Sequence, residues 1–180
     1  EQRRKIIADL EEMEAMIAAT LAFARDDAAA EPSVPVGLAA LCRTVLDETA
    51  DAHPELADSI AYAGPEHLTV RARPVALKRA LANLIGNAIA YGGSARLSLQ
   101  QAMPGQVRIA IEDDGPGVPI EEQEGVFQPF RRLETSRIRE TGGTGLGLPI
   151  ARNILRAHGG DVVLSNRPGG GLTALATMPA

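Results

Sequence analysis

The sequence predicts an α/β (α+β) two-layer sandwich, in which a mixed, mainly antiparallel sheet of about five strands is covered on one face by about three helices. Apolar residues recur at helical spacing in some segments and at strand spacing in others. Many of the predicted strands are joined by short turns, which favours this fold over a doubly wound parallel sheet. The length of 180 residues fits one domain of about 150 residues with an appended element.

The appended element is the N-terminal segment. Apolar residues from Ile6 to Leu21 repeat at spacings of four and three, so residues 1–25 are predicted to form one long helix. Such a helix either packs on its own domain or pairs with other helices in a bundle, and its high charge favours the bundle. Residues 26–36 contain two prolines and are expected to be a linker, with the main domain at 37–180.

The main domain alternates helices and strands. Pro74 stands at the favoured first turn of one helix. The predicted helices are 37–51, 74–91, 120–126 and 146–158. The predicted strands are 57–62, 67–72, 95–101, 106–113, 161–166 and 172–178.

Composition narrows the classes of function. The net charge is −5, which argues against a nucleic-acid binder because no broad basic field is implied. No run of about 18 apolar residues is present, so no membrane span is predicted. The single cysteine, Cys42, lies in an apolar helical pattern and is expected to be a buried, inert thiol in a reducing, cytoplasmic setting.

Two asparagines on one predicted helix form the first candidate site. Asn83 and Asn87 are four residues apart and therefore share a helix face. Asparagine is a mediocre helix former, so the pair needs a reason. The two side chains either make structural hydrogen bonds at a helix–sheet junction or supply an oxygen ligand to Mg²⁺.

Two glycine-containing segments form further candidates. Asp113-Asp114-Gly115-Pro116-Gly117 follows a predicted strand and is either a plain turn or a surface for a flat ring, with a carboxylate as acceptor. Gly142 to Leu148 opens a helix and is either a hinge or a phosphate cradle, because glycines expose backbone N–H groups at the positive helix end.

Between these two segments lies Phe127-Gln128-Pro129-Phe130-Arg131-Arg132. The two aromatics are expected to anchor an otherwise polar loop while the arginines reach an anion. The alternative is a solvated basic patch beside a small hydrophobic plug.

The order of the four motifs resembles the ATP-binding catalytic domain of sensor histidine kinases, in the wider family of gyrase, heat-shock chaperone and mismatch-repair ATPases. The resemblance covers residues 36–178. It is greatest to kinases of the osmolarity-sensor type in two segments, Pro74 to Tyr91 and Phe127 to Phe130.

The resemblance implies ATP and Mg²⁺ as cofactors. Asn87 would coordinate Mg²⁺, and Asp113 would accept a hydrogen bond from the adenine amine. Two residues would be catalytic, Asn83 at the phosphate end and Arg132 near the terminal phosphate. The residues expected to bind the nucleotide are Asn87, Tyr91, Asp113, Gly115, Gly117, Phe127, Phe130, Gly143, Thr144, Gly145, Leu146 and Gly147.

A lid is expected at 118–142, anchored by Phe127 and Phe130. One departure from the family concerns Ala90, where many relatives have a basic residue, so one phosphate contact is missing or supplied elsewhere. Hydrolysing relatives have Glu at the position of Asn83, and an amide cannot act as a general base, so hydrolysis is expected to be slow.

The family's phosphate acceptor is a helical histidine in a motif that His53, His67 and His158 do not match. All three are expected to be structural or solvated, and the acceptor is expected upstream. The segment 1–25 would be the second helix of the dimerisation and phosphotransfer bundle. The expected partners are that bundle in a homodimeric parent anchored in the bacterial inner membrane, and a response-regulator receiver domain.

Three other interpretations stay open. The first is an ATP-hydrolysing conformational clamp, against which Asn83 and the short C-terminus argue. The second is a non-catalytic dimerising module with a dead nucleotide pocket. The third is an anti-sigma serine kinase, which would not need the N-terminal bundle helix.

Overall fold

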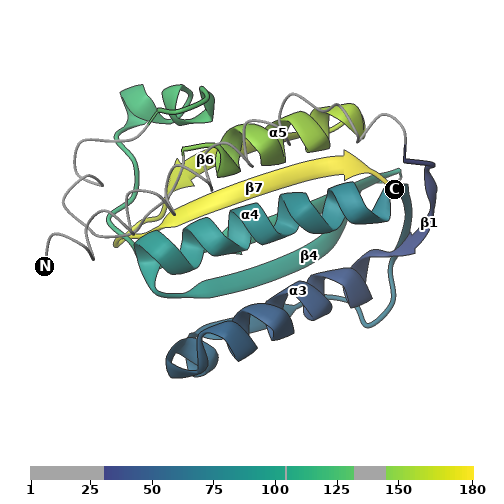
Figure 1. The fold of residues 1–180 in the computed structure, drawn as a ribbon, viewed down its shortest axis with the longest axis horizontal. Coiled ribbons are helices and arrows are strands. Elements are labelled where there is room, and N and C mark those ends of the chain that lie inside the picture. Colours follow the sequence, from purple (N-terminus) through teal and green to yellow (C-terminus); the bar gives the residue numbers. More distant parts are fainter. Residues whose placement is uncertain (1–30, 104, 132–144) are drawn as a thin grey trace, which may run out of the picture.

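The computed structural model describes residues 31–103, 105–131 and 145–180. The predicted helix at 1–25 and the first part of the predicted linker lie outside these residues. Within them, a five-stranded sheet is covered on one face by three helices that lie side by side (Figure 1). The predicted two-layer fold class is confirmed.

The helices and strands carry the labels of Figure 1. The helices are α3 (Leu38–Ala52), α4 (Pro74–Gly92) and α5 (Gly147–Ala157). The 3-10 turns are η1 (Pro54–Ser59), η2 (Ile120–Glu122) and η3 (Gly125–Phe127). The strands are β1 (Val34–Gly37), β2 (Ile60–Ala63), β3 (Thr69–Ala72), β4 (Ala95–Met103), β5 (Gln106–Glu112), β6 (Asp161–Asn166) and β7 (Leu172–Pro179).

The main sheet has the strand order β2-β4-β5-β7-β6. Only the β2–β4 pair is parallel, and the other three pairs are antiparallel. The register aligns Arg96 with Glu112 and Glu112 with Thr173 across the three central strands. The sheet is therefore mixed and mainly antiparallel, as predicted, and its central strand β5 ends directly before Asp113.

The core lies between the helices and one face of the sheet. On β5, side chains alternate between buried and more exposed, so one face is turned to the helices. Helix α4 has a buried stripe at helical spacing. Large side chains with less than 2% exposure include Leu77, Leu81, Leu84, Ile85, Leu97, Leu99, Ile109 and Ile111. Burying each stabilises the fold by about 1.5–3 kcal/mol relative to exposure. Cys42 is buried as predicted, and burial raises the pKa of its thiol to about 12.

Three local predictions need correction. Residues 34–36, expected in the linker, belong to β1, which pairs antiparallel with β3 in a separate two-stranded sheet. The predicted strand at 57–62 begins only at Ile60, because Pro54 opens a 3-10 turn. The predicted helix at 120–126 is two separate 3-10 turns, η2 and η3.

Two side chains that are distant in sequence accept hydrogen bonds from backbone N–H groups at the N-terminal end of α4. The N-cap residue itself provides no side-chain cap. The carboxylate of Glu31 accepts hydrogen bonds from the backbone N–H groups of Val75 at 2.8 Å and Ala76 at 3.0 Å. Nε2 of His158 accepts the N–H of Arg73 at 3.0 Å, while Nδ1 donates to the carbonyl oxygen of Ile154 at 2.7 Å. The end of α5 is thereby joined to the start of α4, so the two helices run antiparallel.

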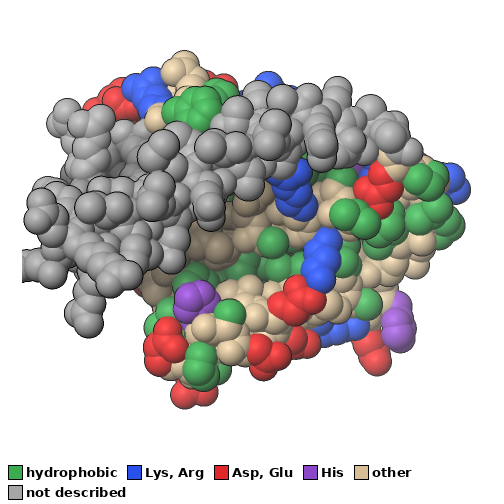
Figure 2. Space-filling model, viewed as in Figure 1, with side chains coloured by type: hydrophobic (Ala, Val, Ile, Leu, Met, Phe, Trp, Pro, Cys, Tyr) green, Lys and Arg blue, Asp and Glu red, His purple; other side chains and the backbone are tan. Residues whose placement is uncertain are grey.

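The helix-covered surface is acidic along one edge. In Figure 2, Asp and Glu side chains gather along the lower edge, where Figure 1 places α3. Lys and Arg side chains are scattered over the coloured part of that face. None of the described helices combines the length and the apolarity that a bilayer span requires.

Candidate functional site

The two asparagines of α4 lie against the first residue of α5. A Cβ built on Gly147 would lie 3.5 Å from Oδ1 of Asn83 and 3.6 and 3.7 Å from Nδ2 and Oδ1 of Asn87. The amides therefore share one face, as predicted, and that face meets the N-terminus of α5. This helix has no side-chain cap and no acidic residue in its first turn, so the part of the chain that the structure describes leaves its first N–H groups and positive end uncompensated.

Asn83 is distinguished by an unsatisfied polar atom. Its Nδ2 is buried and has no hydrogen-bond partner among the described residues. A buried donor without an acceptor costs about 1–3 kcal/mol. Within the described residues, the structural alternative, in which both side chains are satisfied at a helix–sheet junction, finds no acceptor for Asn83 Nδ2. The donor fits an incoming oxygen ligand beside Gly147.

Asp113 stands at the end of β5 in a buried position, with 6% of its surface exposed. Its Oδ1 accepts hydrogen bonds from the backbone N–H groups of Gly115 at 2.7 Å and Leu172 at 3.3 Å. Burial raises the pKa of this carboxyl group, although the two backbone hydrogen bonds act in the opposite direction. No donor from the described residues is hydrogen-bonded to Oδ2, which leaves one carboxylate oxygen for a ligand.

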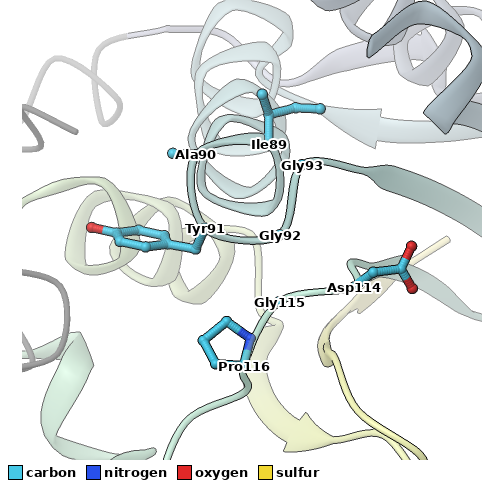
Figure 3. Close-up of a pocket in the computed structure, with 8 residues that line it drawn as sticks. All are labelled: Ile89, Ala90, Tyr91, Gly92, Gly93, Asp114, Gly115 and Pro116. Carbon is cyan, nitrogen blue, oxygen red and sulfur yellow. The ribbon is translucent and has the colours of Figure 1, made fainter. Parts of the chain in front are cut away.

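Asp114 has the opposite environment. Its carboxylate accepts two hydrogen bonds from Arg96, at 2.7 and 2.6 Å, and one from the hydroxyl of Ser94 at 2.9 Å. These hydrogen bonds, from Arg96 first, hold its pKa well below the usual range. In Figure 3 its side chain points away from Tyr91 and Pro116. Of the two adjacent carboxylates, Asp113 is therefore the one with a free acceptor.

Close backbone approaches join Asp113 to the end of α4. A Cβ on Gly92 would come within 2.5 Å of Cβ of Asp113. A Cβ on Gly115 would lie 2.9 Å from both Oδ1 of Asp113 and the carbonyl oxygen of Tyr91. Real Cβ atoms do not approach so closely, so both positions require glycine. The segments of Asn87 and Asp113 thus meet at one end of the molecule.

An open hollow of about 570 Å³ adjoins this junction. It is lined by Ile89, Ala90, Tyr91, Gly92, Gly93, Asp114, Gly115 and Pro116 (Figure 3). Asn83, Asn87 and Asp113 are not among the lining residues. Of the predicted nucleotide-binding residues, Tyr91 and Gly115 line the hollow, so it covers only part of the predicted site.

The two phenylalanines differ. Phe127 is 8% exposed, and the guanidinium of Arg152 lies 4.4 Å from its ring centroid. Phe130 is 53% exposed and has a positive φ of 64°, so of the two rings Phe127 is the one that is buried against the described residues. The backbone N–H of Phe130 donates to the carbonyl oxygen of Gly145 at 3.1 Å, which connects the aromatic motif to the glycine motif. Leu146 is buried, with 1% exposure.

Arg131 does not project as a free cation. Its guanidinium pairs with the carboxylate of Glu122 at 2.5 Å and lies so close to Gly125 that a Cβ there would contact it at 2.6 Å. Arg132, Gly143 and Thr144 lie outside the described residues, and so does the part of the predicted lid beyond Arg131.

The three histidines are structural or solvated, as predicted. His158 is hydrogen-bonded through both ring nitrogens to backbone groups. The side chains of His53 and His67 are 45% and 88% exposed, and each lies near a neighbouring glutamate.

Two residues that shape the site were not predicted from the sequence. Asn166 at the end of β6 accepts from the N–H of Val118 and donates to its carbonyl oxygen, both at 2.8 Å, and thereby orients the segment that follows Gly117. Arg167 donates to the carbonyl oxygen of Asp113 at 2.8 Å. Neither lies in a motif. The run Gly169 to Gly171 was the available signal, because it marks a turn that another backbone can approach.

Comparison with family models matches residues 72–180 to the histidine kinase-, DNA gyrase B- and HSP90-like ATPases. Sensor histidine kinase GtrS of Pseudomonas aeruginosa is 39% identical over 172 residues, covering 95% of this chain and 34% of its own length. Sensor protein CutS of Streptomyces coelicolor is 34% identical over 179 residues, covering 98% and 43%. The chain thus spans less than half of either relative.

Solved structures agree. The catalytic domain of histidine kinase ThkA has a TM-score of 0.69 at 27% identity, covering 82% of this chain and 96% of its own. Full-length ShkA in complex with AMPPNP has a TM-score of 0.77 at 26% identity, covering 99% of this chain and 39% of its own. The chain therefore belongs to the family of histidine kinase-, DNA gyrase B- and HSP90-like ATPases, as an ATP-binding catalytic domain of the sensor histidine kinase type.

Proposed function

We propose that Mg·ATP binds where the end of α4, the start of α5 and the segment Asp113–Gly117 meet. The observation that carries this proposal is the convergence of a buried donor without a described partner, Asn83 Nδ2, with the helix start at Gly147, which has no side-chain cap. Phosphate oxygens are suited to both, because they accept hydrogen bonds and are attracted to a helix N-terminus. The free Oδ2 of Asp113 would accept the adenine amine.

The residues present fit a magnesium ion. The side-chain oxygen of Asn87 stands beside Gly147, where a phosphate would lie, and one amide oxygen with phosphates and water completes an octahedron. Among the residues with described positions, no three His, Cys, Asp or Glu side chains group around a possible ion. A bound Mg²⁺ would supply neutralisation of the phosphate charge.

The chain's own groups would position the γ-phosphoryl and exclude water. Asn83 would donate from Nδ2 to a phosphate oxygen, and Gly145, Leu146 and Gly147 would present backbone N–H groups. Arg132, Gly143 and Thr144 would add contacts, as the family resemblance implies. Tyr91, Gly115, Gly117, Phe127 and Phe130 would shape the rest of the site.

We propose that the acceptor is a histidine on dimerisation and phosphotransfer helices, which pass the phosphoryl group to an aspartate of a response regulator. The parent protein would be a homodimer with this domain on the cytoplasmic side of a bacterial inner membrane. The sensor kinase relatives support this proposal. The segment at 1–25 would be part of the bundle, residues 26–33 the linker and residues 118–142 the lid.

The assignment to the osmolarity-sensor type rests on Pro74–Tyr91 and Phe127–Phe130 alone. The similar proteins found do not specifically favour that subtype.

The competing function within the family is ATP hydrolysis as a conformational clamp. An amide at Asn83 cannot remove a proton from water, so we expect steady-state ATP turnover well below about 1 per second. Turnover at or above that rate would favour the clamp.

Replacing Asn87 tests the site directly. Titration of the chain with ADP, with and without Mg²⁺, should show that Asn87→Ala loses roughly tenfold in Mg²⁺-dependent affinity, because one metal ligand is removed. Asn153→Ala is the matched control, since Asn153 is exposed on α5. An Asn87→Ala variant that keeps the full Mg²⁺ effect would contradict the proposal.

A further inference from the structure

One guanidinium contacts three consecutive residues at the end of β5. Arg167 lies in the turn between β6 and β7, outside the motifs that predicted the site. Its Nη1 donates to the carbonyl oxygen of Asp113 at 2.8 Å and to Oδ1 of Asp114 at 3.0 Å. Its Nε lies 3.5 Å from Oε2 of Glu112. The side chain is 27% exposed, so these contacts are partly shielded from solvent.

We infer that Arg167 is a positioning residue for recognition of the nucleotide base, because it fixes the backbone of Asp113 so that the free carboxylate oxygen faces the base. The inference rests on the proposed function, in which Asp113 accepts the adenine amine. It adds a residue that the family resemblance did not supply.

Arg167 completes the fixation of Asp113. The N–H of Asp113 donates to the carbonyl oxygen of Leu172 at 3.0 Å, and its Oδ1 accepts from Gly115 and Leu172. The carbonyl oxygen of Asp113 is held by Arg167. Because the N–H, the carbonyl oxygen and Oδ1 of Asp113 are all hydrogen-bonded, the orientation of Oδ2 is fixed. A base-specific hydrogen bond needs this fixed orientation, because its acceptor must be held within about 0.5 Å of the productive position.

The turn itself is shaped to reach Asp113. Gly171 has a φ of 97°, and a Cβ there would lie 2.2 Å from the carbonyl oxygen of Asp113. The N–H of Arg167 donates to the carbonyl oxygen of Gly171 at 3.0 Å. This hydrogen bond closes the turn and aims the guanidinium of Arg167 at the same carbonyl oxygen.

Arg96 provides a matched control. It also pairs with Asp114, through two short hydrogen bonds, and its side chain is 38% exposed. It has no hydrogen bond to Asp113 among the described residues. Replacing Arg96 therefore removes a charged contact from the same carboxylate without releasing the backbone of Asp113.

The experiment measures binding of Mg·ADP and Mg·IDP, whose base has an oxo group in place of the exocyclic amine. The wild-type chain should prefer ADP. Arg167→Met should weaken ADP binding by roughly fivefold and reduce the preference for ADP over IDP by a similar factor, with IDP affinity nearly unchanged. Arg96→Met should leave both affinities within about twofold.

Arg167→Lys keeps a cation and one donor direction, so it should recover part of the preference for ADP over IDP. It also replaces Arg167→Met in the test if that variant does not fold. Urea denaturation of the two Met variants should show similar losses of stability. Retention of the full preference for ADP in a folded Arg167 variant, or equal weakening of ADP and IDP, would overturn the inference.

Asp113→Asn separates this inference from the proposed function. If Asp113→Asn abolishes the preference for ADP while the Arg167 variants keep it, only the inference about Arg167 fails. If the wild-type chain shows no preference, or Asp113→Asn keeps it, Asp113 does not recognise the base, and the proposed function of that residue fails as well.

Discussion

The two ends of α4 differ in how their polar groups are satisfied. At the N-terminal end, Glu31 accepts from two backbone N–H groups and His158 accepts from a third. Toward the other end, Asn83 has a buried donor without a partner among the described residues, and glycines replace side chains against Asp113. If the proposed site is right, contacts that stabilise the fold lie at one end of α4 and groups left free for the ligand lie toward the other.

The largest expected effect on stability is at the N-terminal end. His158→Ala leaves the backbone N–H of Arg73 without an acceptor in a partly buried position, so it should lower the free energy of unfolding by about 2 kcal/mol. His67→Ala, at an exposed side chain, should change it by less than about 0.5 kcal/mol. Urea denaturation measures both. An ADP affinity that fell together with stability in His158→Ala would break the separation of the two ends.

A smaller effect is expected at Glu31. Glu31→Ala removes the remote cap of α4 and should lower the free energy of unfolding by about 1 kcal/mol. Glu66→Ala, whose side chain is 84% exposed, is the control. Equal stability of the two variants would show that the capping contact contributes nothing.

The smallest expected effect is a gain in the free energy of unfolding, and it concerns Asp113 in the proposed site. Because burial raises the pKa of Asp113, the ionised carboxylate weakens the folded state. The stabilisation that comes from the protonated carboxyl is complete below the pKa of about 3.9 in the unfolded state. It is lost as pH rises through the pKa of the folded state.

Asp113→Asn removes this ionisation and keeps an acceptor for Gly115 and Leu172. It should therefore raise the free energy of unfolding at pH 7 by less than about 1 kcal/mol, while the preference for ADP over IDP is lost. The gain should disappear near pH 3. Thermal unfolding across pH measures it, and a loss of stability at pH 7 would contradict the separation.

Much of the fold and the site could be predicted from sequence because their signals are local. The buried stripe of α4 and the alternation of β5 predicted two elements nearly to the residue. Asn83 and Asn87 stood out because asparagine is a mediocre helix former, whereas Asp113 was singled out by the resemblance. Their meeting at one end followed from the resemblance.

What could not be predicted depends on contacts between distant segments. β1 exists because Val34 to Gly37 pairs with a strand whose partner residues are more than thirty positions away. Glu31, Asn166 and Arg167 act on backbone groups 44, 48 and 54 residues away. No periodicity or motif encodes such pairs. The sequence could not show that Phe130 is exposed while Phe127 is buried, because Phe130 has a positive φ that its residue type disfavours.

The most direct test of nucleotide binding at the C-terminal end of α4 is an NMR titration of isotope-labelled chain with ADP and Mg²⁺. Large shifts are expected for the side-chain amides of Asn83 and Asn87 and for the backbone amides of Gly115 and Gly147. No shift is expected at Val75, where Glu31 caps α4. Shifts at Val75 with unchanged Asn83 and Asn87 would place the nucleotide at the wrong end of the helix and contradict the proposed site.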